Sequence, residues 1–397
     1  MGIFASVMGD FLSQKKSAST QTKSSQLASL VAFQTVGQPV WTPRQYDKLA
    51  FEGYQKNVIV YRSVRLITQS AASIPLILYQ GNERLSVHPL LNLLKSPSSY
   101  QAGSAFMESV ISYLLLSGNS YIEAVCQESG EALELYSLRP DRMRVIPAAD
   151  GTVGCFEYHL KGQTRRIPVD SLTGRSDVLH IKLFNPLNDW YGMSPLEAAA
   201  ISVDQHNTMS SHNLALLQNG GRPSGALVIN GGGEAPHLSE TQREAIRSDV
   251  RRLYEGAQNA GKILILEGDF EWREMGLSPK DLDFVEGRNL AAREIAEAFG
   301  VPPMLVGVPG DATFANYREA RFHLWEDTIL PLVNYLLAEL NLWLVPRFGN
   351  DLRLDYDLDD IPALSLRRES LWSRLEACSF LSSNEKRAML GFPPAKD

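Results

Sequence analysis

The stretch from Asp281 to Val345 constrains the fold most, because it holds two helix signals separated by a loop that cannot be helical. Asp281 to Phe299 contains no proline and a single glycine, and its charged and apolar positions recur at helical spacing. Gly300 stands where a helix would stop, and Pro302 and Pro303 prevent it from continuing. We therefore predict a helix that ends at Phe299.

A second helix is predicted to run from Asn316 to about Val345. Asn316 and Glu319 have the spacing of a capping box, and the intervening residues 301–315 are rich in proline and glycine. Pro331 lies inside the predicted helix and removes a backbone donor, so we expect a kink there.

Four acidic side chains of the first helix fall within an arc of about 80° when the residues are placed 100° apart. They are Asp283, Glu286, Glu294 and Glu297. The opposite side carries Phe284, Val285, Ala291, Ala292, Ile295, Ala298 and Phe299. Such an acidic stripe is usually a solvent-facing side of a core helix, but it equally suits a helix that lines a channel. The residues alone leave both interpretations open.

The composition bounds the possible partners. The 397 residues are 44% apolar and 21% charged, which supports two to four globular units. The formal net charge is −7 and the pI is near 5.6, whereas a protein that grips nucleic acid along its phosphates is usually basic. We therefore expect no tight, non-specific DNA binding over the whole surface, although DNA could slide past such a surface.

The cysteines and the apolar runs exclude other classes. Cys126, Cys155 and Cys378 are far apart and form no CxxC pair, which fits a reducing compartment and predicts no zinc site. Residues 1–12 lack the basic segment of a signal peptide. The most apolar run, 330–345, contains polar residues, so we predict that it is too short and too polar to span a bilayer.

The chain is predicted to have an α+β fold. Residues 1–45 form a flexible arm, because Ser13 to Ser29 is a low-complexity run of Ser, Thr, Gln and Lys. Residues 46–193 form an α+β domain. Its predicted helices are 58–73 and 104–116, and its predicted strands are 76–79, 121–127, 132–138, 143–146, 155–160 and 178–184.

A compact insert separates two further helices. Ser194, Pro195 and Glu197 combine an N-cap, a proline at the first turn and a capping-box glutamate, which predicts a helix to about Gln218. Its polar positions are mostly neutral, so this helix is weak alone and needs neighbours on more than one side. The insert, about 222–274, contains predicted strands at 226–229 and 270–273. The two flanking helices should therefore run antiparallel.

No catalytic, metal or cofactor site is predicted. Gly256 to Lys262 matches GxxxxGK, but Ile263 replaces the magnesium-binding Ser or Thr, and a helix precedes the motif instead of following it. His180 lies in an apolar strand without a nucleophile at an informative spacing. His206 and His212 lie on different faces of one helix. A soluble nucleotide-binding enzyme remains the rival hypothesis.

Three arginines recur at helical spacing in the insert: Arg243, Arg247 and Arg251. They form either a solvated face that is partly neutralised by nearby glutamates, or a surface for docking an acidic partner. Both interpretations stay open.

A resemblance to a known family is carried by several short stretches between residues 46 and 345. They are Val58 to Pro75, His88-Pro89-Leu90-Leu91 with Leu94 and Pro97, Leu116 to Tyr121, Leu138-Arg139-Pro140, Asp177 to His180, Tyr191 to Leu196, and Phe299 to Pro303. In this order and spacing the chain resembles the HK97-type portal proteins of tailed bacteriophages and the related portals of gene transfer agents.

The resemblance implies a non-enzymatic ring, usually of twelve subunits, at one vertex of a capsid assembled in the bacterial cytoplasm. Double-stranded DNA would pass along its axis. The implied partners are the terminase motor, the head–tail connector proteins and the major capsid protein, with no membrane and no cofactor. A capsid scaffold or adaptor without a channel is a second rival hypothesis.

The resemblance also assigns parts of this chain by position. Residues 46–193 resemble the wing, 194–221 and 277–300 the two stem helices, and 222–276 the clip. Residues 301–315 resemble the tunnel loop, 316–350 the long kinked helix, and 351–397 a C-terminal strand with short crown helices.

Three site assignments follow from the resemblance. The acidic stripe would line the channel, and Arg243, Arg247 and Arg251 would form the docking surface of the clip. The DNA-facing part of the tunnel loop would be Val308, Pro309, Gly310, Asp311, Ala312 and Thr313.

Overall fold

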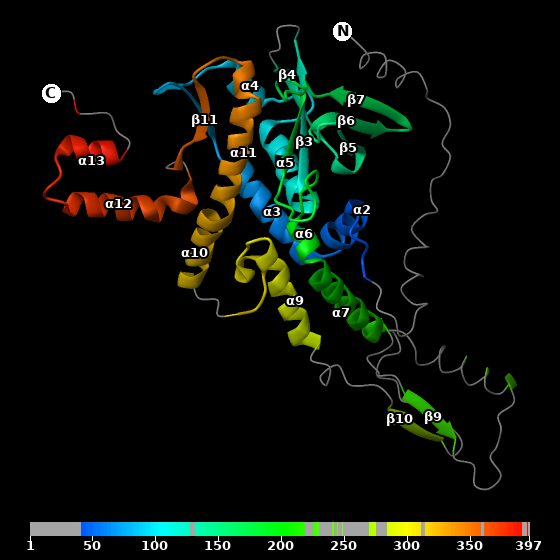
Figure 1. Cartoon of the computed structure of the whole chain (residues 1–397). Coiled ribbons are helices and arrows are strands. Elements are labelled where there is room, and N and C mark those ends of the chain that lie inside the picture. Colours follow the sequence, from blue (N-terminus) through cyan, green and yellow to red (C-terminus); the bar gives the residue numbers. More distant parts are fainter. Residues whose placement is uncertain are drawn as a thin grey trace. The chain divides into compact units, whose positions relative to one another are not determined.

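Figure 1 shows a computed structural model of the chain, which describes residues 41–127, 132–218, 225–229, 240–241, 244, 248, 270–274, 284–310, 314–358, 361–390 and 395. The residues from Thr42 onward form one compact unit. Residues 1–40 of the predicted arm, the arginines 243, 247 and 251, the GxxxxGK run and Asp283 lie outside the described residues.

Two apolar helices form the centre of the unit. α3 (Val58–Ala72) packs against α5 (Gly103–Ser117), which confirms the two helices predicted in this region. Asn57 caps α3, because its side-chain Oδ1 accepts hydrogen bonds from the amides of Ile59 and Val60 at 3.0 and 3.2 Å. Val60 and Val64 have no exposed surface, as their helical spacing predicted.

The strands form small antiparallel sheets. One sheet has the order β4-β3-β8 and a second has the order β5-β6-β7. A third joins β11, β1 and β2, and β9 pairs with β10. The bounds are β1 Leu76–Gln80, β2 Glu83–Leu85, β3 Asn119–Cys126, β4 Ala132–Leu138, β5 Met143–Pro147, β6 Val153–Leu160, β7 Gln163–Pro168, β8 Val178–Lys182, β9 Gly225–Ile229, β10 Phe270–Glu274 and β11 Leu352–Tyr356.

Periodicity did not reveal every element. β7 escaped prediction because four of its six residues are exposed polar side chains, which show no apolar alternation. The short elements α2 (Tyr46–Leu49), the π-helix η1 (Ala50–Gln55) and α4 (Pro89–Lys95) were also missed, because none is long enough to give a helical repeat.

The helix predicted from Ser194 is present but divided. Ser194 caps α6 (Pro195–Ala198), and its Oγ accepts from the Glu197 amide at 2.9 Å, as predicted. Ala199 then takes φ −83° and ψ 1°, so a separate helix, α7 (Ala200–Gln218), continues the chain. The prediction of one unbroken helix was therefore wrong at this residue.

The second half of the stretch 281–345 forms one long helical rod. η4 (Pro303–Val306) follows α9 (Phe284–Ala298), and the rod is α10 (Phe314–His323), the π-helix η5 (Leu324–Ile329) and α11 (Leu330–Trp343). The wider π turn directly precedes Pro331, where the proline ring would otherwise collide with the carbonyl four residues earlier. The predicted capping box at Asn316 is wrong, because the helix already begins at Phe314.

The C-terminal part of the described chain contains η6 (Val345–Arg347), η8 (Pro362–Leu364), α12 (Ser365–Ala377) and α13 (Ser383–Met389). The strand and the two helices predicted after residue 351 are therefore confirmed. Ser382 and Glu385 form a capping box that opens α13.

The long rod is a core helix. By length and composition alone, the helical span Asn316–Arg347, which contains the run 330–345, is long enough and apolar enough to cross a membrane. Its side chains Val333, Leu336 and Leu340 are at most 4% exposed and pack in the main hydrophobic core. Burial in the protein therefore accounts for its apolar composition.

Candidate functional site

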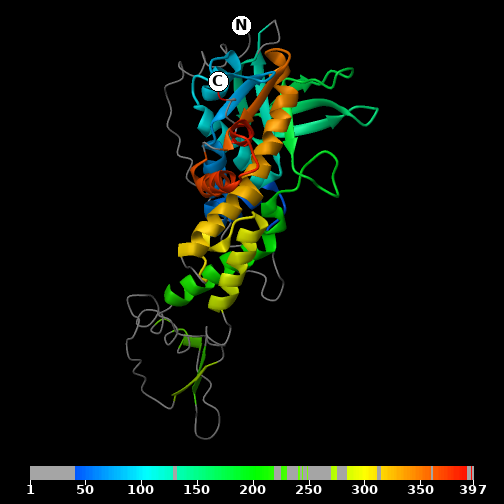
Figure 2. The ribbon, with the colours of Figure 1, turned by 90° about the vertical axis from the view of Figure 1, so that its left-hand side faces the viewer.

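Helices α7 and α9 form an antiparallel pair, as the sequence predicted, and they lie side by side in Figures 1 and 2. Ser202 donates a hydrogen bond to Glu294 at 2.6 Å, and the rings of His212 and Phe284 stack with centroids 4.7 Å apart. Ser202, near the start of α7, thus contacts the end of α9, and His212, further along α7, contacts the start of α9. The two helices therefore run in opposite directions.

The pair is only partly covered by its own chain. Leu196 and Val203 are buried, but further along α7 Leu214 is 57% exposed. On α9, Val285 is 72% and Leu290 is 56% exposed. The subunit by itself therefore leaves apolar surface on both helices open to solvent.

The described members of the acidic stripe, Glu286, Glu294 and Glu297, all lie on the exposed side of α9. Arg293 falls near the same side by helical periodicity, but its guanidinium donates to the backbone carbonyl of Pro309. It therefore faces the loop after α9 and leaves the three carboxylates on the remaining surface. Glu294 also accepts the hydrogen bond from Ser202 and keeps its negative charge.

The loop after α9 is anchored at its base. Gly300 and Gly307 both have positive φ values, 68° and 84°, which turn the chain sharply on each side of η4. Thr328 Oγ1 donates to the Gly300 carbonyl at 2.6 Å, and Val301 is 1% exposed.

The tip of the predicted tunnel loop is only partly described. Pro309 and Gly310 are exposed, whereas Val308 is 6% exposed and packs in the core. The Val308 side chain is thus not available to DNA, which corrects its assignment as DNA-facing. Asp311, Ala312 and Thr313 lie outside the described residues.

A polar junction joins α7 to α3. Asn57 is 1% exposed, and its Nδ2 lies 3.2 Å from Nδ1 of His206 and donates to Oδ1 of Asn207 at 3.0 Å. His206 must then accept at Nδ1, so its proton sits on Nε2. Burial and the charge of Arg288 lower the pKa of His206, which keeps the imidazole neutral. The junction fixes the direction in which α7 leaves the core.

His180 is a structural residue, as the sequence predicted. Its ring stacks on Tyr121 with centroids 4.3 Å apart, and Nε2 donates to Oδ1 of Asn119 at 3.0 Å. Burial, helped by the charge of Lys182, lowers its pKa to about 3.

This histidine should make folding sensitive to acid. The pKa of His180 is lower in the folded than in the unfolded chain. Its contribution to the unfolding free energy is therefore complete above about pH 6.5 and is lost as the pH falls toward 3. Between pH 7.5 and 5.5 we expect the unfolding free energy to fall by about 1 kcal/mol from this group. Urea unfolding of His180→Gln at both pH values should show a smaller fall than the wild type. An identical fall in both proteins would contradict this account.

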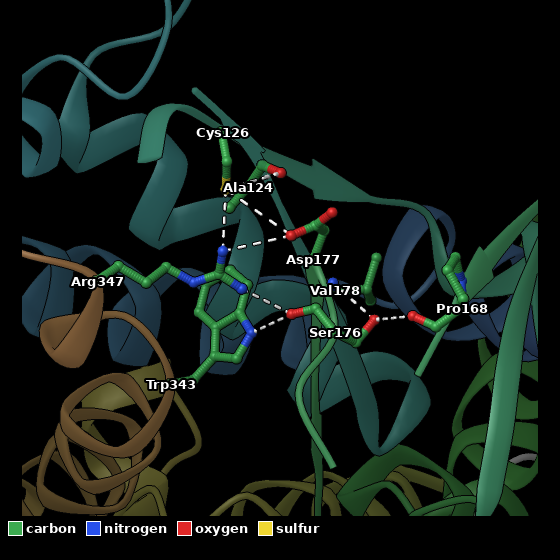
Figure 3. A network of polar contacts seen from close by, with 8 residues as sticks. All are labelled: Ala124, Cys126, Pro168, Ser176, Asp177, Val178, Trp343 and Arg347. Atoms are coloured by element: carbon green, nitrogen blue, oxygen red, sulfur yellow. Dashed lines mark hydrogen bonds and ion pairs between the residues drawn. The ribbon is translucent and has the colours of Figure 1, made fainter. Parts of the chain in front are cut away.

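Arg347 joins the end of the long rod to the central sheet, a contact that no local sequence signal revealed. Figure 3 shows its guanidinium between Cys126, Asp177 and Ser176. The Nη1 atom lies 2.9 Å from Cys126 Sγ and 3.3 Å from Asp177 Oδ1, and Nη2 donates to the Ser176 carbonyl at 2.7 Å. Trp343 Nε1 donates to the same carbonyl at 2.8 Å. Burial raises the pKa of the Cys126 thiol, so it stays protonated and packs as part of this joint.

Within the described part of the chain, no group of three or more His, Cys, Asp or Glu side chains is placed to hold a metal ion. The three cysteines are free. The cavity beside the loop after α9 has a volume of about 550 Å³ and is lined mainly by Pro302, Pro303, Met304 and Val308, with Glu319 and His323 on one wall. Arg293 and Asn316 also line this recess, so its wall combines apolar and polar side chains.

Comparisons with known proteins agree with this architecture. The model of the family described as phage portal protein matches residues 58–391. The chain is 24% identical over 346 residues to the portal protein of Enterobacteria phage HK97, covering 84% of this chain and 78% of that protein.

Two solved structures are more similar. A chain in the neck of an empty GTA particle, computed with C6 symmetry, is 43% identical with a TM-score of 0.72, and the match covers 92% of this chain and 99% of that chain. A chain in the neck of a native GTA particle, computed with C12 symmetry, is 43% identical with a TM-score of 0.70, covering 90% of this chain and 96% of the other.

Proposed function

Because the chain belongs to the phage portal protein family, we propose that it works as a ring of twelve copies at one vertex of a capsid, through which double-stranded DNA is packaged and ejected. The particle would be of the tailed-phage or gene-transfer-agent kind. The C12 symmetry of the similar particle neck supports the subunit number. In this role the chain is a structural component, and the chemistry of packaging belongs to a separate motor.

The exposed apolar side chains of α7 and α9 carry the proposal. Leu214 and Val285 are each more than half exposed in the single subunit, although they lie on helices that pack against each other. A ring would cover these side chains with neighbouring copies of the same two helices. It would also give the weakly amphipathic α7 the neighbours that its sequence requires.

We further propose the division of labour within the subunit. Residues 46–193 form the wing, 194–221 and 277–300 the stem, 222–276 the clip, 301–315 the tunnel loop, 316–350 the long helix and 351–397 the crown. In the stem, Asp283, Glu286, Glu294 and Glu297 line the channel and repel phosphate, so that DNA does not adhere to the wall. This assignment agrees with the exposure of the three described carboxylates.

The clip would contact the motor and then the head–tail connector. We propose that Arg243, Arg247 and Arg251 form this docking surface, since their spacing places them on one side of a helix. Reversing these three charges should abolish motor or connector binding while the ring persists. Unchanged binding would remove the arginines from this role.

The assembly state tests the function directly. Purified protein should form rings with an axial opening, visible in images taken down the axis, with a mass in solution that matches about twelve chains. A stable monomer or dimer at high concentration would instead favour an adaptor without a channel. Binding of ATP that is lost in Lys262→Ala would favour the nucleotide-binding enzyme.

The tunnel loop gives a functional prediction. Deleting residues 309–312 should leave the ring assembled, because the buried Val308, the core anchor at Val301 and the Thr328 contact with Gly300 lie outside the deletion. Packaged DNA should then be retained poorly, since the exposed tip formed by Pro309 and Gly310 is gone. Particles with a normal DNA content would refute the loop assignment. Gly174→Ala, in an open wing turn, is the matched control for a change in an exposed loop.

A further inference from the structure

A groove of about 440 Å³ lies between α3 and α10, and its charge is one-sided. Arg62 from α3 and Arg321 from α10 both line it, and both are exposed. No Asp or Glu lines the groove, and neither guanidinium has an ion-pair partner among the described residues. Arg65 lies one turn further along α3, with Nη1 donating to Tyr61 at 2.7 Å. The groove is therefore a positive site on a chain whose net charge is negative.

The rest of the groove resembles a protein interface rather than a phosphate site. Leu66, Leu305 and Trp325 contribute apolar surface to its lining, and the neutral polar side chains Gln69, Ser70 and Ser73 complete it along α3. At its rim Tyr317 is 44% exposed. Tyrosine, tryptophan and arginine around an apolar floor are the residues enriched in protein–protein interfaces. A site for the DNA backbone would need its cations but not this apolar floor. The expected partner is therefore an acidic protein surface.

An acidic surface lies on the long helical rod, on the side that faces away from the groove. The side chains of Glu319 and Asp327 are 70% and 71% exposed. His323 lies between them, 3.6 Å from Glu319 and 3.1 Å from Asp327, so two carboxylates share one imidazole. Arg293 also faces the neighbouring cavity, but it donates to the carbonyl of Pro309. We call Glu319 and Asp327 the acidic flank.

Helical geometry separates the two charged surfaces. Ala320 and Leu324 are buried and mark the inner line of the helix. Tyr317 and Arg321 line the groove on one side of that line, whereas Glu319 lines the cavity on the other side. The same helix thus presents positive charge in one direction and negative charge in the other.

We propose that the groove of one copy receives the acidic flank of the next copy, which rests on the ring proposed above. In a cyclic ring, each junction brings one patch of a subunit against a different patch of the next subunit. A helix that is positive on one side and negative on the other supplies two such complementary patches. Arg62 and Arg321 then pair with Glu319 and Asp327 of the neighbour. The pairing sets the direction and spacing of the subunits, while the apolar floor contributes buried area.

Charge exchange between two variants tests the proposal. One variant carries Arg62→Glu and Arg321→Glu, so both of its surfaces are acidic. The other carries Glu319→Arg and Asp327→Arg, so both are basic. Each variant alone should lose at least about tenfold in assembly, because like charges meet at every junction. An equimolar mixture should recover rings in which the two variants alternate. Arg144→Glu with Arg175→Glu, exposed in the wing, is the charge-matched control and should assemble as the wild type does.

The outcomes separate this inference from the function on which it rests. Mass in solution and axial images report assembly, and circular dichroism confirms that each exposed variant is folded. Rings from either variant alone, or no rings from the mixture, would overturn the pairing and leave the portal function intact. Assembly with weakened DNA retention would place the groove against DNA and also overturn it. A wild type that forms no ring would overturn the proposed function itself.

Discussion

Replacing Gly192 by alanine is expected to destabilise the subunit by about 3–5 kcal/mol, a large part of the unfolding free energy of a typical domain. An added Cβ would lie 2.1 Å from the Gly118 carbonyl oxygen and 2.7 Å from the backbone N and O of Leu183. All three atoms belong to backbone, so no flexible side chain can move aside. Urea unfolding at one fixed protein concentration measures the loss.

The surrounding hydrogen bonds explain why this site cannot relax. The Leu183 amide donates to the Gly118 carbonyl at 2.8 Å, and the Gly192 amide donates to Oδ1 of the buried Asn119 at 2.8 Å. Moving any of these groups leaves a buried polar atom without its partner. Gly81→Ala is the control, because Gly81 also lies in a turn, with φ 57°, but has open space where its Cβ would stand. It should cost about 1 kcal/mol. Equal losses at both glycines would contradict the steric argument.

The second large effect is expected in the stem. Changing Glu286 and Glu297 to lysine in every subunit should make the ring hold DNA that the wild type lets pass. Both carboxylates are exposed, and the pair leaves the Ser202–Glu294 hydrogen bond between α7 and α9 intact. If lysines around the channel reach six or more phosphates, DNA affinity should fall by about 10³ or more between 50 and 200 mM salt.

Two measurements check this expectation. Binding of duplex DNA to the purified ring, measured against salt concentration, should show the new steep dependence, and DNA ejection from particles should be incomplete. Glu83→Lys with Glu376→Lys is the control, since both residues are exposed and lie outside the stem. An unchanged salt dependence in rings that still assemble would mean that this face of α9 does not line the channel. Loss of the ring would place it in a subunit interface instead.

Local chemistry was enough to predict most helices and strands. The N-cap at Ser194 and the apolar repeat of α3 act within one or two turns, so they can be recognised without the rest of the fold. Where local signals were weak, prediction failed. β7 is held by backbone pairing and by ion pairs such as Arg166 with Glu157 at 2.9 Å, and neither leaves an apolar repeat in the sequence. Asn316 had the residues of a capping box, but α10 extends past it to Phe314.

In the candidate site, too, some features were predicted from the sequence and others were not. Helical periodicity placed Glu286, Glu294 and Glu297 on one side of α9, and the structure finds all three exposed. The contact of the Arg293 guanidinium with the Pro309 carbonyl was not predicted, because it depends on how the loop after α9 folds back. Val308 was assigned to the loop tip by position, yet it is buried because the loop folds back onto the core.

The sequence by itself determined the antiparallel pair of helices around an insert, the long proline-containing rod and the family resemblance, because caps, prolines and periodicity are local. Only the tertiary structure decided the close approach of Gly118 to Gly192, the joint made by Arg347, and the groove that brings Arg62 of α3 beside Arg321 of α10. Each of these depends on distances between residues that are far apart along the chain, and no short segment encodes such a distance.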